Sequence, residues 1–241
     1  MGQYTYRYPH PAVAADCVVL GYDGRHLRVL LIERRHDPCG GMWAFPGGFM
    51  EIDETADAAA RRELKEETSL EVGEMWQIGV FSDVHRDPRE RVLSVAFLSL
   101  TCVAEVRGGD DAARARWWPM DSLPPLAFDH ADMLRQAVGL LRRRIRFAPV
   151  GLGVLPEVFV KDHLQQLYEA IVGHGIDISR LLAWLLQNGV VQQVEMMENQ
   201  TDARFVFVPE RYNRWAGNDT EVIPFGRHTV NCHSTTLSTP I

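Results

Sequence analysis

Apolar residues in the first half of the chain fall in short runs separated by turn-forming residues, a pattern typical of β-strands. The predicted strands cover residues 12–21, 27–34, 42–46, 75–81, 91–103 and 115–120. Tyr22-Asp23-Gly24 provides a turn between the first two, which are therefore expected to pair. The two stretches with helical character are residues 56–65, with Thr55 as N-cap, and a stretch from the N-cap Asp129 to about Arg146.

The second half shows a different order of elements. Residues 147–156 contain two Pro and two Gly and form a candidate linker. Helices are then expected over residues 157–172, ending near Gly173, and over 178–188, with Asp177 as cap and Gly189 in a left-handed conformation.

Alternating polar and apolar residues in 190–195 and 204–209 predict a hairpin around a polar turn at 199–202. Two helices followed by a two-stranded wing outline a small winged-helix domain. The last sixteen residues, 226–241, are polar and aperiodic, and we expect them to form a mobile tail.

Composition narrows the function classes. The chain has 241 residues, 46% hydrophobic and 24% charged, as in ordinary soluble proteins. Its net charge of -7 argues against general attraction to nucleic acid or anionic membranes. It contains no secretion signal and no run of 18 apolar residues, so we expect a cytoplasmic protein. Cys17, Cys39, Cys102 and Cys232 are scattered, which favours reduced thiols over disulfides or a zinc site.

The first predicted helix carries an unusual cluster of acidic residues. Glu63, Glu66 and Glu67 stand at i, i+3 and i+4, which brings three carboxylates onto one face. One interpretation is an acidic face covered only by solvent. Arg62 precedes the cluster and is expected to point to another side of the helix. A divalent cation is the better counter-charge, and carboxylate oxygens suit Mg²⁺ or Mn²⁺.

The acidic cluster belongs to a longer pattern with fixed spacing. Gly48 and Glu54 precede Arg62 and the three glutamates in the order G-x5-E-x7-R-E-L-x-E-E. A chance match in a chain of this length has a probability of about one in 10^5. The pattern resembles the Nudix box, with Ser69 in place of its late glycine. That glycine shapes the helix end, so the chemistry is expected to survive the replacement.

The resemblance implies a Nudix α/β/α sandwich with a mixed sheet over residues 10–147. It also implies a metal-dependent, MutT-like hydrolase that binds Mg²⁺ or Mn²⁺ through Glu63, Glu66 and Glu67. Arg62 would orient the glutamates, and Glu54 would brace or join the metal shell. Gly47 and Gly48 match the glycines of the family's W-x-x-P-G-G segment. They are expected to form a tight loop that helps to hold the substrate.

Residues 82–90 form a loop that is rich in ionisable groups. Such a loop is either a surface turn or a substrate-facing segment. In the second case Arg86 and Arg89 would bind substrate. The general base would be Glu67 or, as a second choice, His85, Asp87 or Glu90 of this loop. A similar R-D-P-R loop occurs in the ADP-ribose pyrophosphatase group of Nudix enzymes.

Further segments resemble a Nudix subgroup that carries a C-terminal winged helix, here expected over residues 155–215. They are the F-D-H segment that ends at His130, together with L-P-E-V-F and L-Y-E-A-I downstream. Members of the subgroup include regulators of NAD or sugar metabolism and relatives that hydrolyse ADP-ribose. The resemblance implies a homodimer, to which the apolar helix around Trp184 adds surface.

The resemblance leaves an enzyme and a DNA-binding regulator as alternatives, with a catalytically silent scaffold as a third. The complete box favours a pyrophosphohydrolase that cleaves a nucleoside diphosphate linked to another moiety. ADP-ribose, a sugar nucleotide and a damaged nucleotide remain as substrates, and the first is preferred. Sequence-specific DNA binding is disfavoured because residues 151–208 carry a net charge of -4. The basic residues Arg142, Arg143, Arg144 and Arg146 complement a helix dipole or contact phosphates.

Overall fold

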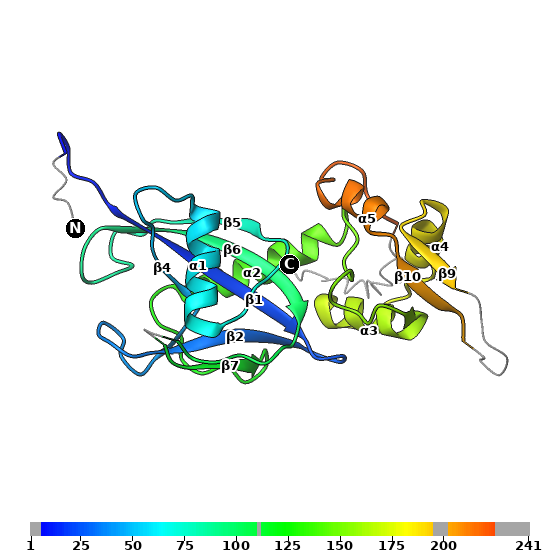
Figure 1. Cartoon of the computed structure of the whole chain (residues 1–241), viewed down its shortest axis with the longest axis horizontal. Helices are drawn as coiled ribbons and strands as arrows, with labels where there is room; N and C mark the ends of the chain where they lie inside the picture. The colour runs from blue at the N-terminus through cyan, green and yellow to red at the C-terminus, as the bar shows by residue number, and fades with distance from the viewer. Residues whose placement is uncertain (1–5, 110–111, 195–201, 225–241) are drawn as a thin grey trace, which may run out of the picture.

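The computed structural model describes residues 6–109, 112–194 and 202–224, and its first part is built on one sheet (Figure 1). The strands of this sheet are β1 (Ala12–Tyr22), β2 (Leu27–Arg34), β3 (Trp43–Ala44), β4 (Gly47–Phe49), β5 (Trp76–Phe81), β6 (Val92–Cys102) and β7 (Ala112–Pro119). Six of them were predicted within a few residues. β4 was expected to be a loop, and that expectation was wrong.

The sheet is mixed, as predicted. Its main order is β3-β2-β1-β6-β5, with β4 added to β1 and β7 added to β2. β1 and β6 run parallel over their whole length, from the Ala12–Val92 pair to the Tyr22–Cys102 pair. The other pairings are antiparallel, including the β1–β2 hairpin expected from the turn after Tyr22. β1 is therefore the central strand on which the rest of the sheet is assembled.

Two helices cover opposite faces of the sheet: α1 (Ala56–Thr68) and α2 (His130–Arg144). The alternation of β1 decides which residues each helix covers. Ala15, Cys17 and Val19 pack in one apolar cluster with Ala59, Ala60 and Leu64 of α1. Val18, Leu20 and Tyr22 pack in another with Met133 and Leu134 of α2. Figure 1 shows α1 in front of the sheet and α2 behind it, which confirms the α/β/α sandwich.

The second part contains a small three-stranded antiparallel sheet, ordered β8-β10-β9, and three helices. Its elements are β8 (Phe159–Val160), α3 (Lys161–Val172), α4 (Ser179–Gln187), β9 (Val191–Val194), β10 (Arg204–Phe207) and α5 (Pro209–Ala216). α3 ends near Gly173, as predicted, and the left-handed conformation predicted for Gly189 is confirmed by its positive φ angle; Gly173 also has a positive φ angle. The predicted turn at 199–202 lies largely outside the described residues, and the predicted tail at 226–241 lies wholly outside them.

Two expectations for this part were wrong in detail, and one helix was missed. The first helix was predicted from residue 157 but begins at Lys161, because Phe159 and Val160 pair with β10. Ile178, not Asp177, occupies the N-cap position of α4. The Asp177 carboxylate still accepts hydrogen bonds from the amide and hydroxyl of Ser179. α5 was not predicted, and its Trp215 ring packs edge-on against Trp184, with the ring centroids 4.5 Å apart.

The candidate linker between the two parts is largely buried. Val150 and Leu155 belong to the same apolar cluster as α2 and α3. The Val150 amide donates a hydrogen bond to the Tyr168 hydroxyl at 3.0 Å. The two parts therefore share a core, and the domain boundaries at 147 and 155 stay a prediction. No helix in the described ranges is long and apolar enough to cross a membrane.

Candidate active site

The ends of α1 are fixed by local contacts that the sequence anticipates. The Thr55 hydroxyl accepts a hydrogen bond from the Ala58 amide at 3.2 Å, which confirms Thr55 as the N-cap. At the other end Ser69 has φ 59°, in the left-handed region where glycine is preferred. The late glycine of the Nudix pattern corresponds to this residue. Ser69 thus preserves the helix end at some conformational cost.

Arg62 is the centre of an ion-pair network. Its Nε and Nη2 contact the two carboxylate oxygens of Glu54 at 3.1 and 2.6 Å. Its Nη1 donates to Oε1 of Glu63 at 2.7 Å and to Oε2 of Glu66 at 3.2 Å. The expectation that Arg62 points to another side of the helix was wrong. Its side chain is long enough to fold back over the acidic face, so one guanidinium joins three glutamates from two segments.

Gly47 and Gly48 bring β4 unusually close to its neighbours. A Cβ on Gly47 would lie 2.4 Å from Oδ1 of Asp16, and one on Gly48 would lie 2.3 Å from Oε1 of Glu63. The Gly47 amide donates a hydrogen bond to Oε2 of Glu67 at 3.0 Å. Both residues pair with β1 in extended conformation. Close approach, rather than the expected tight loop, is what requires glycine here.

The carboxylates of this network lie in different electrostatic environments. Burial raises the pKa of Glu63, and hydrogen bonding and attraction from Arg62 oppose that shift. Hydrogen bonds from Arg62 and from the Glu51 amide hold the pKa of Glu54 below its usual value. Glu67 is almost fully buried, whereas the Glu66 side chain is half exposed. The Glu54 and Glu63 side chains are also largely covered, at 14% and 16% exposed, so Glu66 is the carboxylate of this network that stays open to water.

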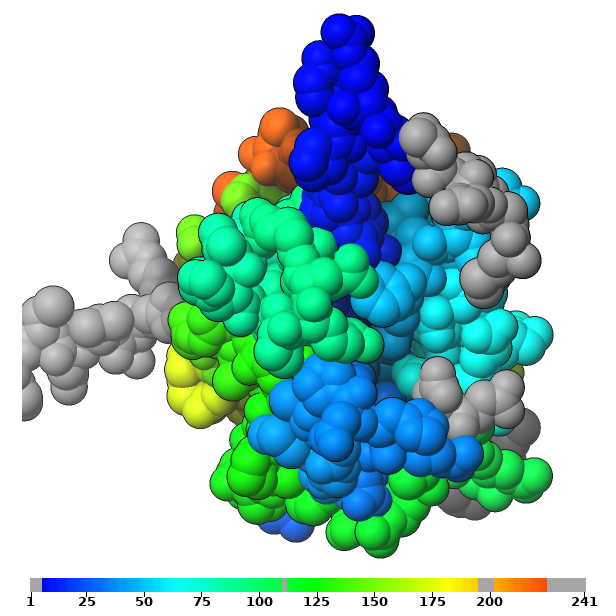
Figure 2. Space-filling view, turned by 90° about the vertical axis from the view of Figure 1, so that its left-hand side faces the viewer, coloured from blue at the N-terminus to red at the C-terminus, as the bar shows by residue number. Residues whose placement is uncertain are grey.

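A cavity of about 510 Å³ is lined by the carboxylates of Glu63 and Glu67. Figure 2 faces it, with the segments around residues 35–41 in blue and 82–90 in green at its edge. Its ionisable lining residues are Asp16, Arg34, Arg35, His36, Asp37, Glu51, Arg62, Glu63, Glu67, Arg86, Asp87, Arg89 and His130. Glu66 and Glu54 are not among its lining residues. A carboxylate floor with several arginines around it suits a ligand that carries phosphates and binds a divalent cation.

Arg86 and Arg89 both line the cavity, yet each is already paired. Arg86 makes two hydrogen bonds to Asp129, at 2.9 and 2.8 Å, and its side chain is only 5% exposed. Arg89 makes two to Asp87, at 3.1 and 2.8 Å, and its guanidinium lies 5.3 Å from the centre of the Phe49 ring. These contacts fix the 82–90 loop against the cavity. The substrate-binding roles of both arginines stay a prediction.

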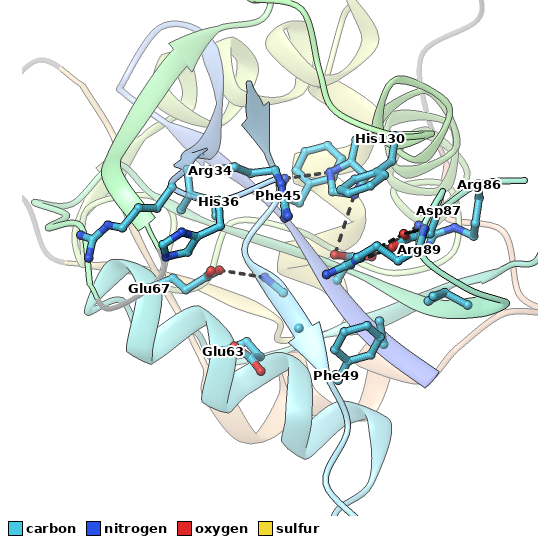
Figure 3. Close-up of a pocket in the computed structure, with 18 of the residues that line it drawn as sticks. Arg34, His36, Phe45, Phe49, Glu63, Glu67, Arg86, Asp87, Arg89 and His130 are labelled. Atoms are coloured by element: carbon cyan, nitrogen blue, oxygen red, sulfur yellow. Dashed lines mark hydrogen bonds and ion pairs between the residues drawn. The ribbon is translucent and has the colours of Figure 1, made fainter. Parts of the chain in front are cut away.

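Several cavity residues were missed in the sequence. Arg34 stands at the end of β2, with its guanidinium 4.9 Å from the centre of the Phe128 ring, and Arg35 and His36 follow it. Asp16 and His130 are buried in the cavity wall, with their side chains 3.9 Å apart (Figure 3). The sequence did contain signals for these residues. Arg34, Arg35 and His36 form a charged run after an apolar strand, Asp16 is a lone aspartate within the apolar run of β1, and His130 ends the F-D-H segment.

The donor atoms at the cavity floor fit a hard divalent cation. Glu63 and Glu67 stand one turn apart on α1, and both carboxylates line the cavity (Figure 3). Oxygen ligands of this kind suit Mg²⁺ or Mn²⁺. Within the described part of the chain, no three His, Cys, Asp or Glu side chains are already arranged as a metal site. Arg62 occupies one face of Glu63, and the metal-ligand roles of the three glutamates stay a prediction.

Comparisons with known proteins agree with this geometry. The NUDIX domain family matches residues 10–137. An ADP-ribose pyrophosphatase of Methanocaldococcus jannaschii is 41% identical over 128 residues, which cover 53% of this chain and 73% of that protein. The ADPR responsive transcriptional repressor NtrR of Acinetobacter baylyi is 29% identical over 193 residues, which cover 78% of this chain and 77% of that protein.

One solved structure extends the likeness to both parts of the fold. The crystal structure of Shewanella oneidensis NrtR complexed with a 27mer DNA superposes with a TM-score of 0.70. It covers 87% of this chain and 99% of that chain, at 24% identity. This likeness shows a shared fold that continues beyond residue 137. From the family match, the glutamate-bearing helix and the mixed sheet together, the chain is a member of the Nudix family.

Proposed function

We propose that this protein is a metal-dependent pyrophosphohydrolase that cleaves a nucleoside diphosphate linked to another moiety, with ADP-ribose as the preferred substrate. This proposal rests mainly on the cavity. Glu63 and Glu67 line it on one side, and Arg34, Arg86 and Arg89 also belong to its lining. Carboxylates hold a divalent cation, and arginines hold phosphates. The 41% identity to an ADP-ribose pyrophosphatase supports the substrate class.

The reaction adds one water across the diphosphate. The water oxygen forms a bond to one phosphorus, the bridging P–O bond breaks, and the products are two phosphomonoesters. Mg²⁺ or Mn²⁺ held by Glu63, Glu67 and Glu66 would neutralise phosphoryl oxygens and lower the pKa of a bound water. Arg62 keeps the glutamates in place through its contacts with Glu54, Glu63 and Glu66.

Glu67 is our choice for the residue that takes the proton from the attacking water. Its carboxylate lines the cavity and is oriented by the Gly47 amide. Of the three candidates in the 82–90 loop, Asp87 lines the cavity, whereas His85 and Glu90 are exposed and are not lining residues. Hydrogen bonds from Arg89 hold the pKa of Asp87 below its usual value, which makes it a weak base.

A substrate panel tests the proposed function. ADP-ribose and a nucleotide sugar are incubated with the protein and Mg²⁺ or Mn²⁺, and the phosphate that a phosphatase removes from the phosphomonoester products is measured. An oxidised nucleoside triphosphate is assayed without phosphatase, by the pyrophosphate released. We expect metal-dependent release, fastest with ADP-ribose. Absence of release from every substrate with either metal would exclude the hydrolase.

A ligand-responsive DNA-binding regulator is the second candidate. It is favoured by the likeness to NtrR, which spans both parts of the chain, and by the helices and hairpin of residues 155–215, which we interpret as a winged helix. Charge argues against it. Arg180 is the single basic residue on α4, and residues 151–208 carry a net charge of -4.

We further propose a cytoplasmic homodimer in which the second part serves assembly. The alternative that it covers the cavity of its own chain is not favoured, because the described lining residues all lie between Ala14 and His130. The surface around Trp184 offers less to a partner than expected, because Trp215 of α5 already packs against it. Sedimentation at tens of micromolar distinguishes a dimer from a monomer.

A further inference from the structure

The segment that connects β3 to β4 is held at three successive residues by three different elements. The Phe45 amide donates to Nδ1 of His130 at 2.9 Å. The Pro46 carbonyl accepts from the Cys17 amide at 2.8 Å. The Gly47 amide donates to Oε2 of Glu67 at 3.0 Å. The position of this segment therefore determines where the Glu67 carboxylate is held relative to the cavity.

His130 is the side chain in this arrangement that the proposed function does not yet use. It begins α2, is only 3% exposed, and its ring stacks on the Phe45 ring with the centroids 5.1 Å apart (Figure 3). Because Nδ1 accepts the Phe45 amide, that nitrogen carries no proton. The proton of the neutral ring is then on Nε2, which lies 3.9 Å from Oδ1 of Asp16.

We propose that His130 is a positioning residue for the reaction: its neutral ring, protonated on Nε2, fixes the Phe45–Gly47 segment and thereby the carboxylate of Glu67. The inference rests on the proposed function for its effects on turnover and on Mn²⁺ affinity. The hydrogen-bonded path from His130 to Glu67 exists independently of any substrate. Side chains that orient metal ligands from behind typically change metal affinity or activity by 10- to 100-fold when removed.

The surroundings of His130 keep the ring in the required state. Burial lowers its pKa below the ordinary value, and the nearby cations Arg86 and Arg34 act in the same direction. Asp16 and Asp129 oppose them by favouring the charged ring. A second proton would have to enter at Nδ1, where it would face the Phe45 N–H donor. The hydrogen bond that holds the segment would then be lost.

Two substitutions distinguish the role of His130 as a hydrogen-bond acceptor from the packing of its ring against Phe45. His130→Asn places an amide oxygen near the position of Nδ1, so it can still accept the Phe45 amide, but it cannot titrate. His130→Phe keeps a flat ring against Phe45 and provides no acceptor. Each variant is compared with wild type for hydrogen exchange of the Phe45 amide, for the Kd of Mn²⁺ by electron paramagnetic resonance, and for kcat and KM.

We expect His130→Phe to speed exchange of the Phe45 amide and to weaken Mn²⁺ binding, each by about tenfold or more. Its kcat should fall by a similar factor, with KM changed less. For His130→Asn, the exchange rate of the Phe45 amide, the Kd of Mn²⁺, kcat and KM should stay within about threefold of wild type, since the hydrogen-bond acceptor remains. A purely structural role for His130 would lower thermal stability and leave Mn²⁺ affinity and kcat of the folded protein unchanged. That result would overturn the proposal.

A measurement on wild type keeps the inference testable even where His130→Phe does not fold. The ¹⁵N spectrum of the histidine rings should show His130 neutral at pH 7, with Nδ1 unprotonated, and a proton on Nδ1 would contradict the proposal. The exchange and tautomer measurements need no substrate and no metal. They therefore remain decisive if no substrate in the panel is hydrolysed, an outcome that would refute the proposed function alone.

Discussion

Gly48 and Glu63 are packed so closely that a Cβ on Gly48 would lie 2.3 Å from Oε1 of Glu63. A methyl group at this position must displace the carboxylate, because the flexible end of Glu63 moves more easily than the β4 backbone. Gly48→Ala is therefore expected to lower kcat at least tenfold while thermal stability changes little. Gly79→Ala is the matched control, since a Cβ there meets no atom within 4 Å. Equal loss of activity in both variants would contradict this interpretation.

Charge removal on the acidic face tests the metal roles. Glu66→Gln and Glu67→Gln keep the size of the side chain but remove one negative ligand, so Mn²⁺ binding should weaken and kcat should fall at least tenfold. Glu71→Gln serves as control because Glu71 is exposed and paired with Lys65 at the surface. Wild-type rates for both box variants at saturating Mg²⁺ would show that the cluster is not the active site.

Replacing Ser69 by the glycine that the family has at this position should make the protein more stable. Its φ of 59° places a side chain in the left-handed region, which glycine adopts without that strain. Ser69→Gly is expected to raise the unfolding free energy by about 1 kcal/mol and Tm by roughly 2–4 °C, with activity unchanged.

Gly189→Ala provides the opposite test, since Gly189 has φ 65° and open space around its Cα. It should destabilise by about 1 kcal/mol. Thermal denaturation of the two variants measures both effects. A lower Tm for Ser69→Gly would mean that the serine side chain contributes more than its backbone strain costs.

The Asp87–Arg89 pair predicts a pH dependence of stability. Hydrogen bonds from Arg89 lower the pKa of Asp87 below 3.8, so the folded state favours the charged carboxylate. This stabilisation is present above the unfolded pKa and is lost as pH falls through the folded value. Asp87→Asn should thus unfold at lower temperature than wild type at pH 7. The unfolding free energy of the variant should be lower than that of wild type by about 1–2 kcal/mol at pH 7. This difference should shrink below about pH 4. A difference in Tm that is constant across this range would contradict the prediction.

Weak and non-specific DNA binding is expected, carried by the basic cluster Arg142, Arg143, Arg144 and Arg146 at and just after the end of α2. Arg142 donates to the Ile171 carbonyl at 2.9 Å, and Arg144 contacts the Ala216 carbonyl and Glu74. Of the basic cluster, Arg143 and Arg146 remain for phosphate contacts, so log K against log salt should have a slope no steeper than about -1.8. A mobility-shift assay with DNA from upstream of its own gene checks this at several salt concentrations. A discrete nanomolar complex that ADP-ribose dissolves would establish the regulator instead.

Local sequence determined much of the fold. The Thr55 cap and the glycines at 173 and 189 are set by contacts within a few residues. Apolar runs marked six of the strands, although pairing partners such as Ala12 and Val92 lie 80 positions apart. The helix that carries Glu63, Glu66 and Glu67 was also predicted, because their spacing brings the three side chains onto one face only if the segment is helical. Some errors were small shifts of boundaries, as at the start of α3, where pairing with β10 replaced the first turn, whereas β4 and α5 were missed altogether.

Tertiary structure decided which of these residues act together. Arg62 reaches Glu54, eight positions away, because the loop before α1 returns to the helix, and no local rule predicts that path. β4 is extended because β1 offers it a partner, and Phe45 finds the acceptor His130, 85 positions later in the chain. The candidate linker is buried because both parts contribute to a single apolar core. The sequence by itself named the carboxylates, whereas the hydrogen bonds that orient them depend on segments that meet only after folding.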